Sequence, residues 1–335
     1  MKSYKDIVKK EDIIKYLNNL KGKSLLVYSP TSANKIKLLE KIENENLHLM
    51  NTHLTDIDVD KINEFIKNEK DLDRVIGFGG GTANDIAKFI GNQLNIETVS
   101  IPSMLSTNVY STNKVLMSKE GKVSTLDSKM PDLIIFDKNI LNLSLQENLY
   151  GFADVLTIYT AHSDWYKSYK KGYDRMDENL YQMDVKLLED TQKYILTNSY
   201  DDIKTNLFEM FNFIGMVGHI TNLYGSGRPV SGSEHIFAKA LEQRILVPHG
   251  ISVGLGILIM SLYQSNYSEN IEKCFEKLQI FQNAEKYHVN KEIIMKNLKE
   301  LKPREGRYTV VNEMDKNDIN ILNEIDKILE KFKIK

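Results

Sequence analysis

Residues 75–90 are Val-Ile-Gly-Phe-Gly-Gly-Gly-Thr-Ala-Asn-Asp-Ile-Ala-Lys-Phe-Ile. The first four residues form an apolar run typical of a buried strand, and the apolar positions Ile86, Phe89 and Ile90 predict a helix after it. Three consecutive glycines join the two elements. Because they carry no Cβ, their backbone N–H groups can approach a pyrophosphate, and a helix N-terminus favours negative charge. The stretch predicts a strand–turn–helix unit that binds a phosphate, with a tight turn that binds no ligand as the alternative.

The chain around this stretch alternates between strand and helix patterns up to about residue 145. Further short apolar runs, each bounded by turn residues, predict strands at 25–28, 98–102 and 133–136. Strands that alternate with helices favour a mostly parallel sheet covered on both faces. Beyond residue 145 the apolar spacing is helical, and it predicts helices at 181–196, 207–219, 235–241, 251–263 and 321–332. We therefore expect an α/β nucleotide-binding domain over residues 1–145 and an all-helical domain over residues 146–335.

Composition excludes several classes of protein. The 335 residues are 41% hydrophobic and 27% charged, as in globular domains, and a net charge of −2 lacks the basic excess of a nucleic-acid binder. The single cysteine, Cys274, excludes an intrachain disulfide and a zinc site made of several cysteines, and it fits a reducing cytoplasm. The sequence has no targeting segment and no run of about 18 apolar residues, so we expect a cytoplasmic protein without a membrane span.

Two histidines and one aspartate have the residue types of a catalytic zinc site. His235 and His249 each lie at the start of a predicted helix, and Asp154 lies in an apolar helical start where an isolated carboxylate would be costly to bury. Two imidazoles and a carboxylate leave the fourth zinc position to water or substrate. Each residue alone would more often be structural, so the prediction depends on the three together.

These motifs together resemble the dehydroquinate synthase-like and iron-containing alcohol dehydrogenase superfamily. The pattern GGG-x3-D-x2-K at 79–88 is similar to its nucleotide signature, and Gly-Phe-Ala-Asp, Ser-Gly-Ser-Glu-His and His-Gly match its metal ligands in order. Residues 151–165 and 225–235 are similar to the sn-glycerol-1-phosphate dehydrogenase branch. Ile158 stands where iron-type members carry a histidine, which favours zinc over a four-ligand iron site and leaves other divalent metals open.

The resemblance implies a metal-dependent NAD(P)H oxidoreductase that reduces a small phosphorylated ketone, foremost dihydroxyacetone phosphate to sn-glycerol 1-phosphate. Zinc on Asp154, His235 and His249 would act as a Lewis acid on the carbonyl. Arg228 is expected either to clamp the substrate phosphate or to make a structural ion pair. The alternatives are a glycerol dehydrogenase-like reductase of an unphosphorylated polyol or ketone, a dehydroquinate synthase-like carbocycle-forming lyase, and a non-catalytic binding protein. A homo-oligomer is expected.

Two departures from the family pattern leave the substrate open. Asn108 stands where the branch carries an aspartate that contacts the substrate hydroxyl, and an amide cannot take up a proton as a carboxylate can. Thr107 replaces a common histidine. Because of Asn108, a related 2-keto or aldehyde phosphate, or a larger sugar-like ketone, is an alternative substrate.

The cofactor is predicted to be NAD(H), NADP(H) or both. Residues 28–35 contain no acid that would reject a 2′-phosphate, and they include Lys35. Trp165 is expected to pack in the helical core, and His162 is expected to line the cleft or pack in the core. The predicted cofactor contacts are Gly79, Gly80, Gly81, Thr82, Asp85, Ser103, Thr107, Ser111 and Lys129.

Overall fold

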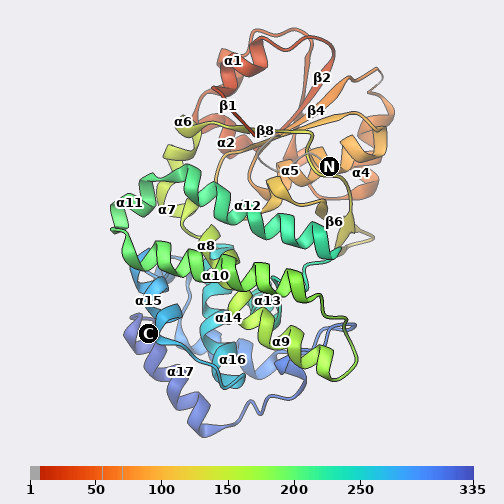
Figure 1. The fold of residues 1–335 in the computed structure, drawn as a ribbon. Helices are drawn as coiled ribbons and strands as arrows, with labels where there is room; N and C mark the ends of the chain where they lie inside the picture. The colour runs from red at the N-terminus through yellow and green to blue at the C-terminus, as the bar shows by residue number, and fades with distance from the viewer. Residues whose placement is uncertain (1–7, 55, 70) are drawn as a thin grey trace. The chain divides into compact units, whose positions relative to one another are not determined.

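A computed structural model describes residues 8–54, 56–69 and 71–335 (Figure 1). The chain divides into two compact units, Met1–Asn148 and Leu149–Lys335. The division falls close to residue 145, where the apolar spacing of the sequence changes from strand and helix to helix alone.

The first unit is built on a six-stranded sheet in which every pair of neighbours is parallel. The strand order is β1-β8-β5-β4-β2-β3. This confirms the mostly parallel sheet that the alternating pattern predicts. The strands are β1 (Val8–Lys10), β2 (Ser24–Tyr28), β3 (Leu47–Asn51), β4 (Arg74–Gly79), β5 (Glu97–Pro102) and β8 (Leu133–Phe136).

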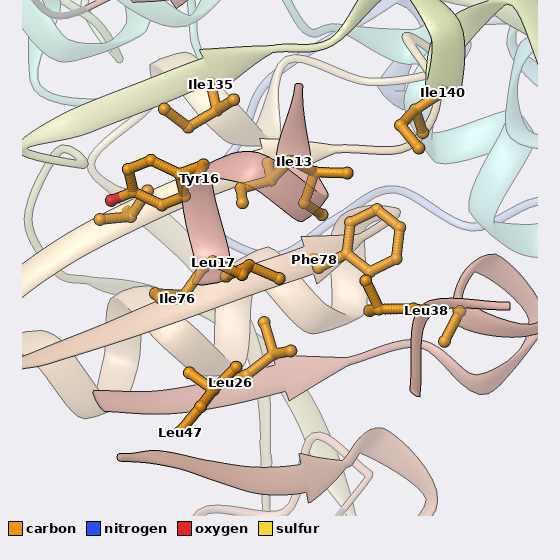
Figure 2. Close-up of a cluster of buried hydrophobic side chains, with 13 residues drawn as sticks. Ile13, Tyr16, Leu17, Leu26, Leu38, Leu47, Ile76, Phe78, Ile135 and Ile140 are labelled. Atoms are coloured by element: carbon orange, nitrogen blue, oxygen red, sulfur yellow. The ribbon is translucent and has the colours of Figure 1, made fainter. Parts of the chain in front are cut away.

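Both faces of the sheet are buried, which explains why its central strands are nearly continuous apolar runs. Leu26 and Ile76, on neighbouring strands, contribute to one apolar cluster with Leu17 (Figure 2). Their chain neighbours Leu25 and Val75 point to the opposite face and join a second cluster. The first cluster includes residues of α1 (Ile13–Asn18), α2 (Pro30–Lys35), α3 (Leu38–Lys41) and α6 (Lys138–Leu141), and the second includes residues of α4 (Val59–Lys67) and α5 (Gly81–Leu94).

Four strands have no counterpart in the sequence prediction. β1 and β3 lie at the two edges of the sheet, and their residues are mostly half-buried or exposed. β6 (Lys114–Lys119) and β7 (Lys122–Asp127) form a separate antiparallel hairpin. Only one side of the hairpin packs on the core, through Val115 and Met117. Polar and charged residues interrupt the apolar signal in all four strands.

Residues 149–335, all of which the structure describes, form helices and no strand. This confirms the helical C-terminal region. No helix among the described residues combines the length and the apolar character needed to cross a bilayer. The helices are α8 (Gly151–Leu156), α9 (Ile158–Lys170), α10 (Glu178–Thr197), α11 (Tyr200–Thr205), α12 (Leu207–Tyr224), α13 (Ser233–Glu242), α14 (His249–Tyr263), α15 (Glu269–Leu278), α16 (Lys291–Glu300) and α17 (Ile319–Lys331).

Candidate active site

Three helices of the second unit bring the predicted metal ligands together. Asp154 lies on α8, His235 on the first turn of α13 and His249 at the first residue of α14. The Oδ1 atom of Asp154 is 3.4 Å from Nε2 of His249 and 3.8 Å from Nε2 of His235. One ligand atom from each residue lies within 4.8 Å of the other two. The spacing is that of three ligands around one ion.

The surroundings of Asp154 fit a cation. The residue is 7% exposed, and its Oδ1 atom is buried without a hydrogen-bond partner. A buried carboxylate oxygen without a partner is costly, and a divalent ion between this oxygen and the two imidazoles would remove that cost. The donor set of one carboxylate and two imidazoles is also that of a catalytic zinc.

A carboxylate orients each of the two imidazoles. Nδ1 of His235 lies 2.9 Å from Oε1 of Glu234, and Nδ1 of His249 lies 2.7 Å from Oε1 of Glu242. A proton on Nδ1 then donates to the carboxylate and leaves the Nε2 lone pair for a metal. Both Nε2 atoms are the ones nearest Asp154. Sequence reasoning missed both glutamates: Glu234 lies inside the His235 motif, but nothing local marks Glu242.

Electrostatics favour positive charge at this site. Burial alone would lower the pKa of His249, but the carboxylates of Asp154 and Glu242 outweigh it and raise that pKa to about 10. Burial alone would raise the pKa of Glu234, but His235, the Gly232 N–H group and the Thr160 hydroxyl outweigh it and lower that pKa. The ionised glutamates therefore stabilise a cationic centre.

Close helix packing sets the position of His235. A Cβ on Gly256 of α14 would lie 2.5 Å from the carbonyl oxygen of Glu234. Glycine is therefore needed at this position for α14 to approach the first turn of α13. The approach holds the backbone next to His235 against the helix that begins with His249.

Glu242→Gln is expected to lower metal affinity by about 10–100-fold, the usual loss when a carboxylate partner of a metal-binding histidine is removed. The amide keeps the shape and an acceptor oxygen but loses the charge that favours the oriented imidazole. Metal affinity is measured by competition with a chromophoric chelator. Glu324→Gln, at an exposed glutamate paired with Lys327, is the matched control. Equal affinity in wild type and Glu242→Gln would show that Glu242 does not position His249.

The glycine turn of the first unit joins β4 to α5. Gly79 has φ +148°, and a Cβ there would lie 2.7 Å from Cβ of Ser29, so this position requires glycine. Gly80 caps α5 and Gly81 begins it, and a Cβ on either would meet no atom within 4 Å. Thr82 is exposed on the first turn of the helix. The turn therefore offers open backbone at a helix N-terminus.

Ser103 lies beside this turn. Its N–H group donates to the carbonyl of Gly79 at 2.9 Å, and its hydroxyl is 2.8 Å from that of Ser32. Thr107 and Asn108 follow in the half-buried loop after β5. Ser111 ends the short 3-10 helix η3 (Val109–Ser111) beyond that loop.

Three of the predicted cofactor contacts point elsewhere. Ser111 is fully buried and its hydroxyl donates to the carbonyl of Asn108. Asp85 is buried against Lys88 and accepts from the N–H group of Leu116. Lys129 donates to the carbonyl of Ile96, just before β5 begins, whereas the glycine turn lies where the strands end. Partners within the protein occupy these three side chains in this structure, and their roles as cofactor contacts stay predictions.

Arg228 follows the structural alternative. It is 2% exposed, and its Nε atom lies 2.8 Å from Oδ2 of Asp174. Its Nη2 donates to the carbonyls of Asp164 and Tyr308 at 2.7 and 2.8 Å. Its guanidinium therefore joins three segments of the helical unit, which favours the structural ion pair over the phosphate clamp.

His162 and Trp165 both pack inside the helical unit. Trp165 is fully buried, and its indole N–H donates to the carbonyl of Arg175. His162 stacks on Tyr181 with ring centroids 4.3 Å apart and lies 3.1 Å from Oδ2 of Asp184. Neither side chain belongs to the metal site.

Comparisons with known proteins give one consistent result. The family model of iron-containing alcohol dehydrogenases matches residues 9–144. Glycerol-1-phosphate dehydrogenase (NAD(P)+) of Sulfurisphaera tokodaii is 28% identical, over 88% of this chain and 86% of that protein. The enzyme of the same name from Methanococcus aeolicus is 29% identical, over 74% and 76%.

Solved structures share the fold. A probable glycerol dehydrogenase from Sinorhizobium meliloti covers 98% of this chain, and this chain covers 96% of it, with a TM-score of 0.68 and 16% identity. Sulfoacetaldehyde reductase from Bifidobacterium kashiwanohense, solved in complex with NAD+, gives a TM-score of 0.60 at 14% identity, with 96% of each chain covered. These matches support the resemblance of the chain to the glycerol-1-phosphate dehydrogenase branch of the iron-containing alcohol dehydrogenase superfamily.

Proposed function

We propose that the protein is a metal-dependent reductase that uses NAD(P)H to convert dihydroxyacetone phosphate to sn-glycerol 1-phosphate. The observation that supports this most directly is the convergence of Asp154, His235 and His249 around an unpartnered carboxylate oxygen. The relatives named glycerol-1-phosphate dehydrogenase (NAD(P)+) supply the substrate and the cofactor of the proposal.

In this proposal the three side chains hold one divalent metal, with zinc as the expected ion. Bound there, zinc would act as a Lewis acid on the ketone oxygen of the substrate. Glu234 and Glu242 hold the two imidazoles with Nε2 turned to the ion. Asp154 adds a negative charge to the ligand set and holds its oxygen in place through burial on α8.

The nicotinamide cofactor would supply the hydride, and the protein supplies binding and orientation. We propose that Gly79, Gly80 and Gly81 hold the pyrophosphate, with the hydroxyls of Thr82 and Ser103 beside them. Thr107 stays a proposed cofactor contact. Asn108 stays a proposed contact to a substrate hydroxyl, where its amide can donate or accept but cannot take up a proton.

Gly80→Val is expected to weaken nicotinamide nucleotide binding while the protein stays folded. Gly80 has φ −77°, which valine tolerates, and no atom lies within 4 Å of the added Cβ. The side chain would therefore project from the turn and block close approach of a pyrophosphate. Calorimetric titration with NADH and NADPH measures the effect, and circular dichroism checks the fold. Unchanged affinity for both nucleotides would contradict the proposed cradle.

The function is tested by following nicotinamide absorbance with the metal-loaded protein and either dihydroxyacetone phosphate or dihydroxyacetone. The proposal expects the phosphorylated ketone to be the better substrate and sn-glycerol 1-phosphate to be the product. Preference for dihydroxyacetone would instead indicate a glycerol dehydrogenase activity. Phosphate release without net oxidation of the cofactor would indicate a lyase. A cytoplasmic location and a homo-oligomer also stay proposals, and light scattering tests the oligomeric state.

A further inference from the structure

A cavity of about 500 Å³ in the helical unit borders the metal triad, because His235 forms part of its wall. α13 supplies one side of this cavity, and the segment that follows α16 supplies another. The walls are strongly basic, with one carboxylate, Glu300, against several cations. The cationic side chains are Lys239, Arg244, Lys302, Arg304 and Arg307.

Only part of this charge is neutralised within the protein. Arg244 donates to Oε2 of Glu300 at 2.6 Å and to Oδ1 of Asn297 at 3.1 Å, so the arginine and the glutamate compensate each other. Arg307 donates to the hydroxyl of Ser231, which carries no charge. Among the described residues, no carboxylate makes an ion pair with Lys239, Arg304 or Arg307.

The uncompensated cations repel one another. Burial, with Arg228 and Arg304 nearby, lowers the pKa of Arg307 to about 10. Partial removal from water, with Arg304 and Arg307 nearby, lowers the pKa of Lys239, and the carboxylate of Glu242 offsets only part of this effect. Arg307 still carries its charge at neutral pH, so an anion that entered the cavity would relieve the repulsion.

Helix geometry places this charge next to the metal ligands. Lys239 follows His235 by four residues on α13, so the two side chains lie on the same face of the helix, about 6 Å apart along its axis. In dihydroxyacetone phosphate only one carbon and one oxygen separate the carbonyl carbon from phosphorus. A ketone oxygen near the Nε2 atom of His235 would therefore leave a short substrate's phosphate within reach of the cavity.

We propose that this cavity is the phosphate subsite of the enzyme, in which Lys239, Arg304 and Arg307 bind the phosphate of a small phosphorylated ketone. The inference depends on the proposed function, since it assigns the substrate phosphate of that reaction to these residues. It also replaces Arg228 in that role, because Arg228 is held by Asp174 and two backbone carbonyls. Guanidinium groups bind phosphate in a bidentate manner, and an ammonium adds a point charge.

Lys239→Gln and Arg304→Gln test the subsite, because both residues are exposed and tolerate substitution. Each change removes a charge-assisted hydrogen bond, so kcat/KM for dihydroxyacetone phosphate is expected to fall by about 10–100-fold. The value for dihydroxyacetone should change little. Lys273→Gln, at an exposed lysine outside the cavity, is the matched control. Calorimetric titration of the metal-loaded proteins with inorganic phosphate gives a readout that does not depend on turnover.

The outcomes separate this inference from the proposed function. Equal losses on the two ketones, with unchanged phosphate binding, would overturn the subsite while ketone reduction stands. Phosphate binding that needs Lys239 and Arg304, in a protein that reduces no phosphorylated ketone, would support a phosphate site and overturn the proposed substrate. A wild type that neither binds phosphate nor reduces dihydroxyacetone phosphate would overturn both.

Discussion

His249→Ala is expected to lose the metal and to lower kcat/KM for dihydroxyacetone phosphate by about 10³-fold or more, since a bound metal contributes several kcal/mol of charge stabilisation. The substitution removes one of the three proposed metal ligands. It also leaves Glu242 without its imidazole partner and Asp154 without the nearer of its two. Elemental analysis after dialysis measures metal content, and the nicotinamide absorbance assay measures activity.

The control for this prediction is His219→Ala, which removes a histidine of the same unit that lies outside the metal cluster. It should keep both metal and activity. A metal that binds the folded state stabilises it, so added zinc is expected to raise the Tm of the wild type and to leave that of His249→Ala unchanged. Near-stoichiometric zinc in His249→Ala would remove His249 from the ligand set.

Lys88→Met is expected to lower the free energy of unfolding by about 3–5 kcal/mol, the usual cost of leaving a buried charge without its partner. The Nζ atom of Lys88 lies 3.1 Å from Oδ1 of Asp85. It also donates to the carbonyl of Thr112 at 3.1 Å and to that of Lys114 at 2.6 Å. Lys114 is the first residue of strand β6, and Thr112 precedes the strand. Burial lowers the pKa of Lys88 and raises that of Asp85, so each group depends on the other to stay charged.

Urea unfolding of a double-mutant cycle measures this coupling. Asp85→Asn combined with Lys88→Met removes both charges and keeps an acceptor for the N–H group of Leu116. The double variant should therefore be more stable than Lys88→Met alone. Lys186→Met, at an exposed lysine paired with Asp190, should leave stability nearly unchanged, because an exposed ion pair is screened by solvent. A double variant less stable than Lys88→Met would show that the ion pair is not what α5 and β6 depend on.

The sequence alone predicted the elements whose surroundings are simplest. β2, β4, β5 and β8 are buried on both faces or nearly so, and each therefore appears as a short apolar run. β3 and the β6–β7 hairpin have mixed surroundings, so polar residues hide them. Whether such a segment forms a strand depends on the neighbouring strand or helix, and the local sequence pattern carries no information about that neighbour.

Local sequence motifs predicted the three residues of the metal triad but not the carboxylate that orients His249. Asp154, His235 and His249 each lie in a short, specific motif, and the three converge as their resemblance to a family implies. Glu242 had no such signal. It became visible only because α13 and α14 pack closely enough to bring its carboxylate to Nδ1 of His249.

Only the tertiary structure determines the partners of a charged side chain. Arg228, in a family motif, is held by Asp174 and by the carbonyls of Asp164 and Tyr308. Arg304, in a segment without any motif, lies at the wall of a basic cavity and makes no ion pair with a residue that the structure describes. A glycine turn or an apolar strand is set by the properties of consecutive residues, so the sequence by itself determines it. The role of a charged side chain depends on which groups distant in the sequence bind or neutralise it, and only the folded chain brings those groups together.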